Sequence, residues 1–233
     1  MAMDVGYKAN GGMKRRATYD TVLFDLDGTL IDPRIAITHS VHYALVQFGI
    51  DDVDPDDLLP FIGPPLLDSF ERHYGLRGDD GKQAVEHYRT RFSELGPSAN
   101  TPYPGIEELL QSLHADGVRL AIATSKPTVF ASEIVVTLGF DRWLDLVVGS
   151  NLDHTRVAKA EVIAHVLDER PQIREGSVIM VGDREHDVIG ARSHGIDTIG
   201  ATWGYGATGE LERAGAGWLS ADIDELGSLL GAW

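Results

Sequence analysis

The chain has 233 residues, enough for one large domain or for a domain with a sizeable insertion, so its size does not exclude an enzyme. Its formal net charge of -16, with no cluster of Lys and Arg, argues against nucleic acid as a partner, because a phosphate backbone repels an acidic surface. The chain has no cysteine, which excludes a disulfide framework, a thiolate metal site and a cysteine nucleophile and fits a cytoplasmic protein.

The first segment, residues 1–17, mixes glycine, lysine, arginine and asparagine and lacks the hydrophobic stretch of a signal peptide. We expect it to be a disordered leader or tag. No apolar run approaches the roughly 20 residues that a membrane-spanning helix needs, so we expect no membrane partner. Nothing in the sequence indicates an oligomeric state.

The first predicted strand is the β-branched and aromatic run Thr21–Phe24, which ends in a polar segment that begins at Asp25. Residues 34–96 instead show helical periodicity, with apolar residues at spacings of three and four. The segment Gly63-Pro64-Pro65 breaks this stretch into separate helices.

From residue 105 onward, predicted helices and strands alternate, which is typical of βαβ units and a parallel sheet. The predicted strands cover residues 118–123, 146–148, 178–181 and 198–201, and the helices cover 105–117, a segment ending at 139, 157–167, a segment through 194, and 223–230. We therefore predict an α/β fold with a Rossmann-like parallel sheet core. Residues 18–33 and 97–233 would form this core, and residues 34–96 an inserted helical cap.

The strongest motif is Asp25-Leu26-Asp27-Gly28-Thr29, which directly follows the first predicted strand. Two carboxylates one residue apart can face the same cavity once the strand gives way to a turn, which Gly28 permits. One carboxylate could then attack phosphorus while the other exchanges a proton with the leaving oxygen and with water. The alternative is an acidic turn whose side chains only cap a helix.

This motif and its position resemble the haloacid dehalogenase-like hydrolases with a helical cap, in particular phosphoglycolate phosphatases, and the likeness covers nearly everything from Thr21 onward. The resemblance implies that Asp25 is the nucleophile and Asp27 the general acid/base. It also implies that backbone N–H groups after Asp25, including that of Gly28, bind the phosphate. The second aspartate favours phosphate chemistry over dehalogenation.

Two more residues match motifs of this family. Thr124 follows the strand of residues 118–123, and the resemblance implies that its hydroxyl, beside Ser125, holds a phosphate oxygen; taken alone, it would be a helix N-cap. Lys159 matches the lysine that neutralises the nucleophile and the phosphoryl group. The prolines that usually follow this lysine are absent, so Arg156 remains an alternative.

The last motif is Asp183 with Asp187 four residues later, at the end of a buried strand. An unpaired buried carboxylate is costly, so a cation is the natural partner of Asp183. Asp25, Asp183, the backbone carbonyl of Asp27 and waters form an all-oxygen ligand set that suits Mg²⁺. Asp187 would support this metal site through water or by holding Lys159, or would only cap the next helix.

We therefore expect a Mg²⁺-dependent phosphatase that hydrolyses a small phosphate monoester, such as phosphoglycolate, through an aspartyl-phosphate intermediate. A nucleoside 5'-monophosphate phosphatase and a phosphomutase of the same fold are the alternatives. A receiver domain is roughly half this length and has no cap, and a non-catalytic binding protein does not explain the full motif set. The segment Phe61–Leu66 is the candidate specificity loop, and His186 has no companions with zinc-ligand spacing.

Overall fold

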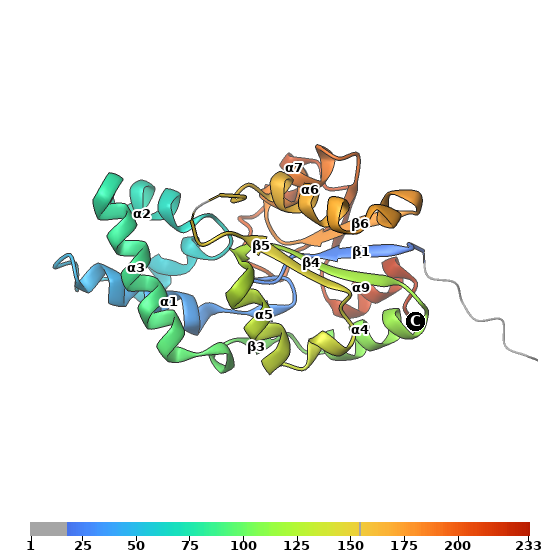
Figure 1. The fold of residues 1–233 in the computed structure, drawn as a ribbon, viewed down its shortest axis with the longest axis horizontal. Helices are drawn as coiled ribbons and strands as arrows, with labels where there is room; N and C mark the ends of the chain where they lie inside the picture. Colours follow the sequence, from blue (N-terminus) through green and yellow to red (C-terminus); the bar gives the residue numbers. More distant parts are fainter. Residues whose placement is uncertain (1–17, 154) are drawn as a thin grey trace, which may run out of the picture.

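A computed structural model describes residues 18–153 and 155–233 of the chain. The leader predicted for residues 1–17 lies outside the described residues. A sheet covered by helices forms one end of the elongated molecule, and helices α1, α2 and α3 form the other (Figure 1).

The sheet has six parallel strands in the order β5-β4-β1-β6-β7-β8. Its strands are β1 (Thr21–Phe24), β4 (Arg119–Pro127), β5 (Leu146–Ser150), β6 (Val178–Gly182), β7 (Asp197–Ala201) and β8 (Trp218–Ser220). The first strand of the chain thus lies in the middle, between β4 and β6, and its carboxyl end points toward the helices at the other end of the molecule (Figure 1).

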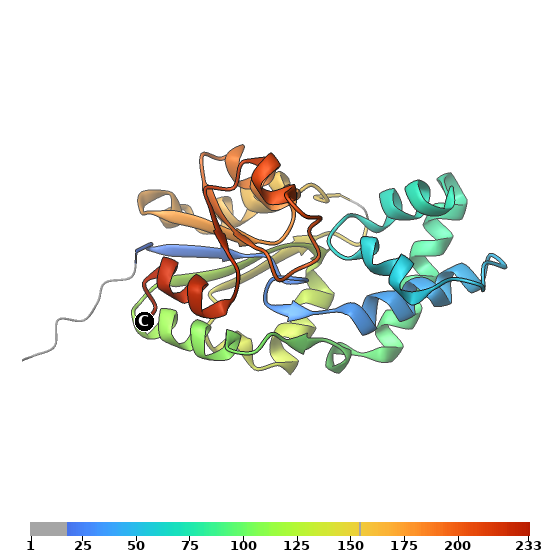
Figure 2. The same ribbon diagram turned by 180° about the vertical axis from the view of Figure 1, so that it is seen from behind.

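Helices cover both faces of the sheet: α6 and α7 lie on one face, and α4, α5 and α9 on the other, as Figures 1 and 2 show from opposite sides. Their bounds are α4 (Ile106–Ala115), α5 (Thr128–Thr137), α6 (Lys159–Glu169), α7 (Glu185–Arg192), α8 (Glu210–Ala214) and α9 (Ile223–Leu230). Short 3₁₀ helices are η1 (Pro55–Phe61), η2 (Pro97–Ala99), η3 (Phe140–Arg142) and η4 (Pro171–Glu175).

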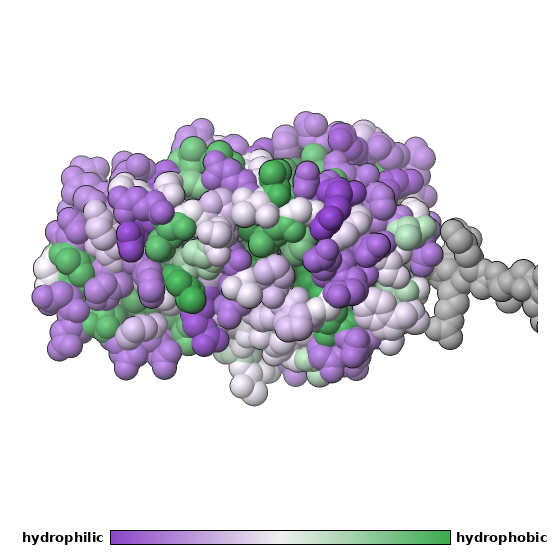
Figure 3. Space-filling model, turned by 90° about the horizontal axis from the view of Figure 1, so that it is seen from below, coloured by the Kyte–Doolittle hydropathy of each residue, from purple (hydrophilic) through white to green (hydrophobic). Residues whose placement is uncertain are grey.

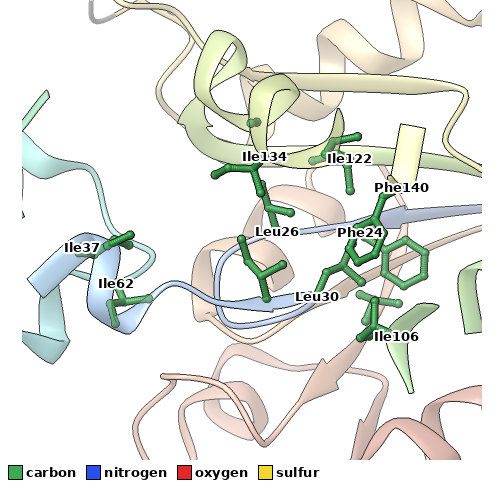
Figure 4. Packing of buried hydrophobic residues seen from close by; sticks show 14 of the residues in the cluster. Phe24, Leu26, Leu30, Ile37, Ile62, Ile106, Ile122, Ile134 and Phe140 are labelled. Atoms are coloured by element: carbon green, nitrogen blue, oxygen red, sulfur yellow. The ribbon is translucent and has the colours of Figure 1, made fainter. Parts of the chain in front are cut away.

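The central strands are apolar on both faces, as burial under two helical layers requires. Phe24 and Ile122 belong to the large apolar cluster on the face of α4 and α5, together with Ile134 and Phe140 (Figure 4). Leu23, the residue that alternates with Phe24, belongs to the second cluster, beneath α6. This is why the predicted strands read as continuous hydrophobic runs.

The inserted helices are α1 (Arg34–Val46), α2 (Leu66–Tyr74) and α3 (Gly78–Leu95), and they fill the predicted cap segment. The chain enters and leaves this region through a two-stranded antiparallel ribbon of β2 (Ile31–Asp32) and β3 (Thr101–Pro102). The large apolar cluster continues into this region, where it includes Ile37 and Ile62 (Figure 4).

The predicted fold class is confirmed: the chain has an α/β fold with a six-stranded parallel sheet and an inserted helical region. The sequence did not predict β2, β3, β8 and α8. Each has five residues or fewer. Elements this short carry too few residues for a period of 2 or 3.6 to stand out, so only tertiary pairing defines them.

No helix within residues 18–153 and 155–233 is long and apolar enough to cross a membrane. One face of the surface is mostly hydrophilic, and its apolar residues form small separate patches (Figure 3). Scattered apolar residues of this kind are ordinary for a protein surface.

Candidate active site

The site lies at the carboxyl ends of the three adjacent strands β4, β1 and β6. Thr124 lies in β4, three residues before the strand ends at Pro127, whereas Asp25 directly follows β1 and Asp183 directly follows β6. Parallel strands end at the same edge of a sheet, which is where open α/β sheets bind ligands. The structure therefore brings the three predicted strand-end residues to one edge.

The turn after β1 folds back sharply because Gly28 adopts a φ of 80°, a left-handed conformation that side chains disfavour. The N–H of Gly28 donates to the carbonyl of Ile31 at 2.8 Å, which closes the turn. A Cβ at position 28 would overlap the carboxylate of Asp183. A glycine here thus serves both the turn and the close approach of the loop to Asp183.

Asp25, Asp183 and Asp187 form a compact acidic cluster, in which one oxygen of each carboxylate lies within 4.8 Å of the others. Their exposed fractions are 4%, 1% and 1%, so water does not screen these charges. Three hard oxygen donors at this spacing can hold a divalent cation such as Mg²⁺.

The charges at this edge do not balance within the protein. The acidic cluster and Asp27 are four buried carboxylates, whereas Lys126 and Lys159 are two buried ammonium groups, so two negative charges remain when all are ionised. A buried excess of charge is costly unless something neutralises it. A divalent cation would supply this balance, so the residues present fit the group that the sequence predicted.

Lys159 is the first residue of α6, and its ammonium group lies against two carboxylates and one backbone carbonyl. Its Nζ contacts Asp25 Oδ1 at 2.8 Å and Asp187 Oδ1 at 2.7 Å, and it donates to the carbonyl of Ala123 at 2.9 Å. Burial lowers the pKa of Lys159, but the charges of Asp187 and Asp25 outweigh it, so the pKa is raised. The ammonium therefore stays charged and holds two of the acidic residues in place.

Asp183 receives weaker support from the protein. Its Oδ2 accepts the backbone N–H of Tyr205 at 2.7 Å, and its Oδ1 lies 3.5 Å from the hydroxyl of Thr29. Burial, and then the charges of Asp25 and Asp187, raise the pKa of Asp183 well above its ordinary value. Burial and the neighbouring charges thus make ionisation of this carboxyl group less favourable than in water.

Asp187 has two partners on different elements. Besides Lys159, it accepts the backbone N–H of Arg184 at 3.1 Å through Oδ2, so it also caps the start of α7. Burial raises its pKa to about 6 even though Lys159 lowers it. Of the roles considered from the sequence, holding Lys159 and capping the helix thus describe the contacts of this side chain.

Asp27 is not part of the acidic cluster and is paired with Lys126, whose Nζ lies 2.8 Å from Oδ1 and 2.7 Å from Oδ2. Burial raises the pKa of Asp27, and Lys126 opposes this effect. A metal contact from Asp27 would come from its backbone carbonyl, and that contact remains a prediction.

Lys126 was not among the site residues that the sequence predicted. Strand β4 continues through Ser125 to Pro127, and both Thr124 and Lys126 are buried. The signal was present in Thr124-Ser125-Lys126-Pro127, but the predicted strand stopped at residue 123.

The other residues predicted to bind phosphate are Thr124 and Ser125. Thr124 is 1% exposed and is not a helix cap, because α5 begins at Thr128. Ser125 lines the cavity described below. Arg156, the alternative to Lys159, donates to the carbonyl of Gly149 at 2.8 Å and makes no contact with the acidic cluster among the described hydrogen bonds and ion pairs.

A cavity of about 520 Å³ opens between the sheet edge and the inserted helices. Its floor includes Asp27, Lys126 and Lys159. Its walls are mainly apolar and come largely from the inserted helices and the predicted specificity loop: Ile37, Phe61, Pro64, Pro65, Leu66, Leu67, Val85, Tyr88, Phe92 and Phe130. The cavity thus lies on the Asp27 side of the site.

Arg184 joins the specificity loop to the acidic edge. It directly follows Asp183, and its Nη1 donates to the carbonyl of Ile62 at 2.6 Å. Its Nε contacts Glu210 Oε1 at 2.9 Å, which fixes the guanidinium from the opposite side. The sequence offered no signal for this contact, since Ile62 is 122 residues away and contributes only its backbone.

Comparison with known protein families matches residues 22–201 to the haloacid dehalogenase-like hydrolases. The chain belongs to this family. It is a phosphatase of the haloacid dehalogenase-like type, as its relatives indicate. It is 45% identical over 212 residues to a 5'-nucleotidase of Pseudomonas aeruginosa, covering 91% of this chain and 96% of that protein.

Other relatives of the same family carry different names. The chain is 38% identical over 212 residues to the tyrosine-protein kinase PtkA of Mycobacterium tuberculosis, covering 90% of this chain and 72% of that protein. It is 29% identical over 198 residues to a phosphoglycolate phosphatase of Agrobacterium fabrum, covering 83% and 84%. A crystal structure of a predicted phosphatase from Clostridium acetobutylicum superimposes with a TM-score of 0.85 at 41% identity, covering 90% of this chain and 97% of that one.

Asp183→Asn should stabilise the metal-free protein at high pH, because it removes one buried negative charge from the acidic cluster. A carboxyl group whose pKa is raised by folding favours the folded state at low pH, and this contribution is lost as the pH rises above the group's ordinary pKa near 4. In metal-free buffer the variant should therefore melt at least about 3 °C above the parent at pH 8, and the difference should shrink toward pH 4.

Mg²⁺ should raise the melting temperature of the parent and leave that of Asp183→Asn nearly unchanged, because a ligand that binds only the folded state stabilises it. Thermal melts with and without chelator across this pH range provide the measurement. Equal shifts by Mg²⁺ in both proteins would show that Asp183 does not hold the cation.

Proposed function

We propose that this protein is a Mg²⁺-dependent phosphatase that hydrolyses nucleoside 5'-monophosphates through an aspartyl-phosphate on Asp25. The observation that carries this proposal is the apolar cavity of about 520 Å³ on the Asp27 side of the site. Cavities of about 300–1,000 Å³ with mainly apolar walls suit ligands of drug-like size. A nucleoside is of that size, whereas phosphoglycolate has only two carbon atoms to fill the space.

The similarity to a 5'-nucleotidase at 45% identity supports the same substrate class. The relative named as a phosphoglycolate phosphatase is more distant, at 29% identity. The expectation of a phosphoglycolate-like ester is therefore less well supported than the nucleotide alternative that the sequence also allowed.

In this proposal the phosphate group lies between Asp25, Thr124 and Lys159, and the nucleoside lies in the cavity above Asp27. The carboxylate of Asp25 attacks phosphorus, and the bond from phosphorus to the ester oxygen breaks as Asp27 gives that oxygen a proton. Water then attacks the phosphorus of the aspartyl-phosphate as Asp27 takes its proton, which releases phosphate and restores Asp25.

Asp25 and Asp183 would hold Mg²⁺, with Asp187 supporting them through Lys159. When bound, the cation supplies positive charge that neutralises the phosphate oxygens. Lys159 contributes a second fixed positive charge, because its contact with Asp25 places the ammonium beside the attacking oxygen. Fixed charges of this kind stabilise the transition state without reorganising during the reaction.

We expect activity to disappear on treatment with a chelator and to return with Mg²⁺. Ca²⁺ should not restore it and should inhibit, because it prefers more ligands and longer bonds than this compact cluster provides. Free phosphate released from an aryl phosphate is the readout. Full activity in thoroughly metal-free buffer would refute the metal requirement.

The substrate class is tested by comparing kcat/KM for nucleoside 5'-monophosphates and phosphoglycolate at saturating Mg²⁺. We expect the nucleotides to be preferred. Leu67→Trp, which fills the cavity wall, should lower kcat/KM for nucleotides by about tenfold or more and leave phosphoglycolate nearly unchanged.

The matched control is Val46→Trp, which adds the same side chain at an exposed position at the end of α1, outside the cavity lining. This variant should keep the activity of the parent on both substrates. A parent enzyme that prefers phosphoglycolate would overturn the nucleotide proposal while leaving the phosphatase mechanism intact.

Substitutions of the two motif aspartates should have different effects on turnover. Asp25→Asn should eliminate turnover of every substrate, because an amide is a far poorer nucleophile than a carboxylate. Asp27→Asn should lower turnover of alkyl phosphates by a factor of about 10² to 10⁴, because their leaving oxygen needs a proton. With aryl phosphates, this variant should still phosphorylate Asp25 and accumulate the intermediate, since hydrolysis lacks its base.

Intact-mass detection of the added phosphoryl group after a burst with an aryl phosphate measures this intermediate. An Asp27→Asn variant with the parent's steady-state turnover on alkyl phosphates would show that Asp27 is not the acid/base.

A further inference from the structure

The two aspartates of the first motif are held by two different lysines. Lys159 forms ion pairs with Asp25 and Asp187 and donates a hydrogen bond to the carbonyl of Ala123. Among the described hydrogen bonds and ion pairs, none joins Lys159 to Asp27. Asp27 is paired instead with Lys126, which the sequence did not predict as a site residue.

Lys126 is buried, and its ammonium group has partners on two other segments of the chain. Its side chain is 5% exposed, and its Nζ lies within 2.8 Å of both oxygens of Asp27. The same Nζ lies 4.7 Å from the centre of the Phe92 ring, over its face. This cation–π contact with α3 supplies further stabilisation where water is excluded.

The backbone fixes the direction from which Lys126 approaches. The register between β4 and β5 shifts between Ala123 and Pro127, and the N–H of Lys126 donates to the Thr124 hydroxyl at 3.3 Å. Lys126 and Asp27 both line the cavity, whereas the other partners of Lys159 include Asp187, which is not among the lining residues. The two motif aspartates are thus paired with different lysines.

We propose that Lys126 is a positioning residue for the proton-transfer steps, which holds the Asp27 carboxylate toward the leaving-group side of the site and away from the acidic cluster. This inference rests on the proposed function, in which Asp27 is the acid/base. A carboxylate offers about four lone-pair positions. Lys126 occupies one on each oxygen and leaves the others for the ester oxygen and for water.

Without Lys126, nothing among the described hydrogen bonds and ion pairs would hold the Asp27 side chain on the cavity side. Its carboxylate could then turn toward the cation expected at Asp25 and Asp183, where it would act as a ligand and not as an acid. The loss should therefore fall on substrates whose leaving oxygen needs a proton.

The experiment measures kcat and KM for a series of alkyl and aryl phosphates with the full chain at saturating Mg²⁺. Lys126→Met should lower kcat/KM for alkyl phosphates by about 30-fold or more, mainly through kcat, and for aryl phosphates by less than about threefold. Lys126→Arg should restore much of the alkyl activity, because a guanidinium can contact both oxygens of a carboxylate.

A double-mutant cycle tests whether Lys126 acts through Asp27. In the Asp27→Asn background, Lys126→Met should change kcat/KM for alkyl phosphates by less than about threefold, since the residue it positions is already gone. The control is Lys82→Met, which removes an exposed lysine of α3 and should behave as the parent.

Equal losses on alkyl and aryl phosphates, or additive losses with Asp27→Asn, would overturn the inference. Should Lys126→Met fail to fold, Lys126→Gln takes its place, and its dependence on the leaving group must lie between those of the parent and Asp27→Asn. A parent that releases no phosphate, or an active Asp25→Asn variant, would instead contradict the proposed function, so the two failures are distinguishable.

Discussion

The structure of the site depends on an excess of buried negative charge. Four carboxylates meet at one edge of the sheet with only two ammonium groups to oppose them. This excess disfavours the metal-free site, because charges removed from water must be paired. A divalent cation bound at the acidic cluster would offset this excess. The same buried charge that makes the metal-free site unfavourable would therefore favour binding of a divalent cation.

The parallel sheet makes this concentration of charge achievable. Strands β4, β1 and β6 end side by side, so residues from positions 25, 124 and 183 reach one point without any long side chain. Two glycines then allow close approach: a Cβ at Gly28 or at Gly204 would overlap Asp183. The rigid layers on both faces hold these ends in place, and the inserted helices add the apolar walls that separate the site from water.

The sequence predicted the fold class, and it named most residues of the candidate site, because both depend on local signals. Buried strands appear as apolar runs, and Asp25, Thr124 and Asp183 immediately follow or end such runs. Lys126 was missed because a strand boundary was placed too early. The contact of Arg184 with Ile62 could not be predicted at all, because a backbone carbonyl carries no side-chain signature and its position depends on how the inserted helices pack.

The two contacts of Arg184 connect the acidic cluster with the loop at Ile62. The backbone N–H of Arg184 donates to Asp187, and its side chain donates to the carbonyl of Ile62, which lies between the cavity-lining residues Phe61 and Gly63. A ligand that shifted this loop would therefore act on a residue adjoining the acidic cluster, and a cation bound at the cluster would act on the loop through the same residue. Linkage requires that any such effect be reciprocal: the factor by which the cation tightens substrate binding equals the factor by which the substrate tightens cation binding. Through the contacts of Arg184, the two affinities would then belong to one coupled equilibrium.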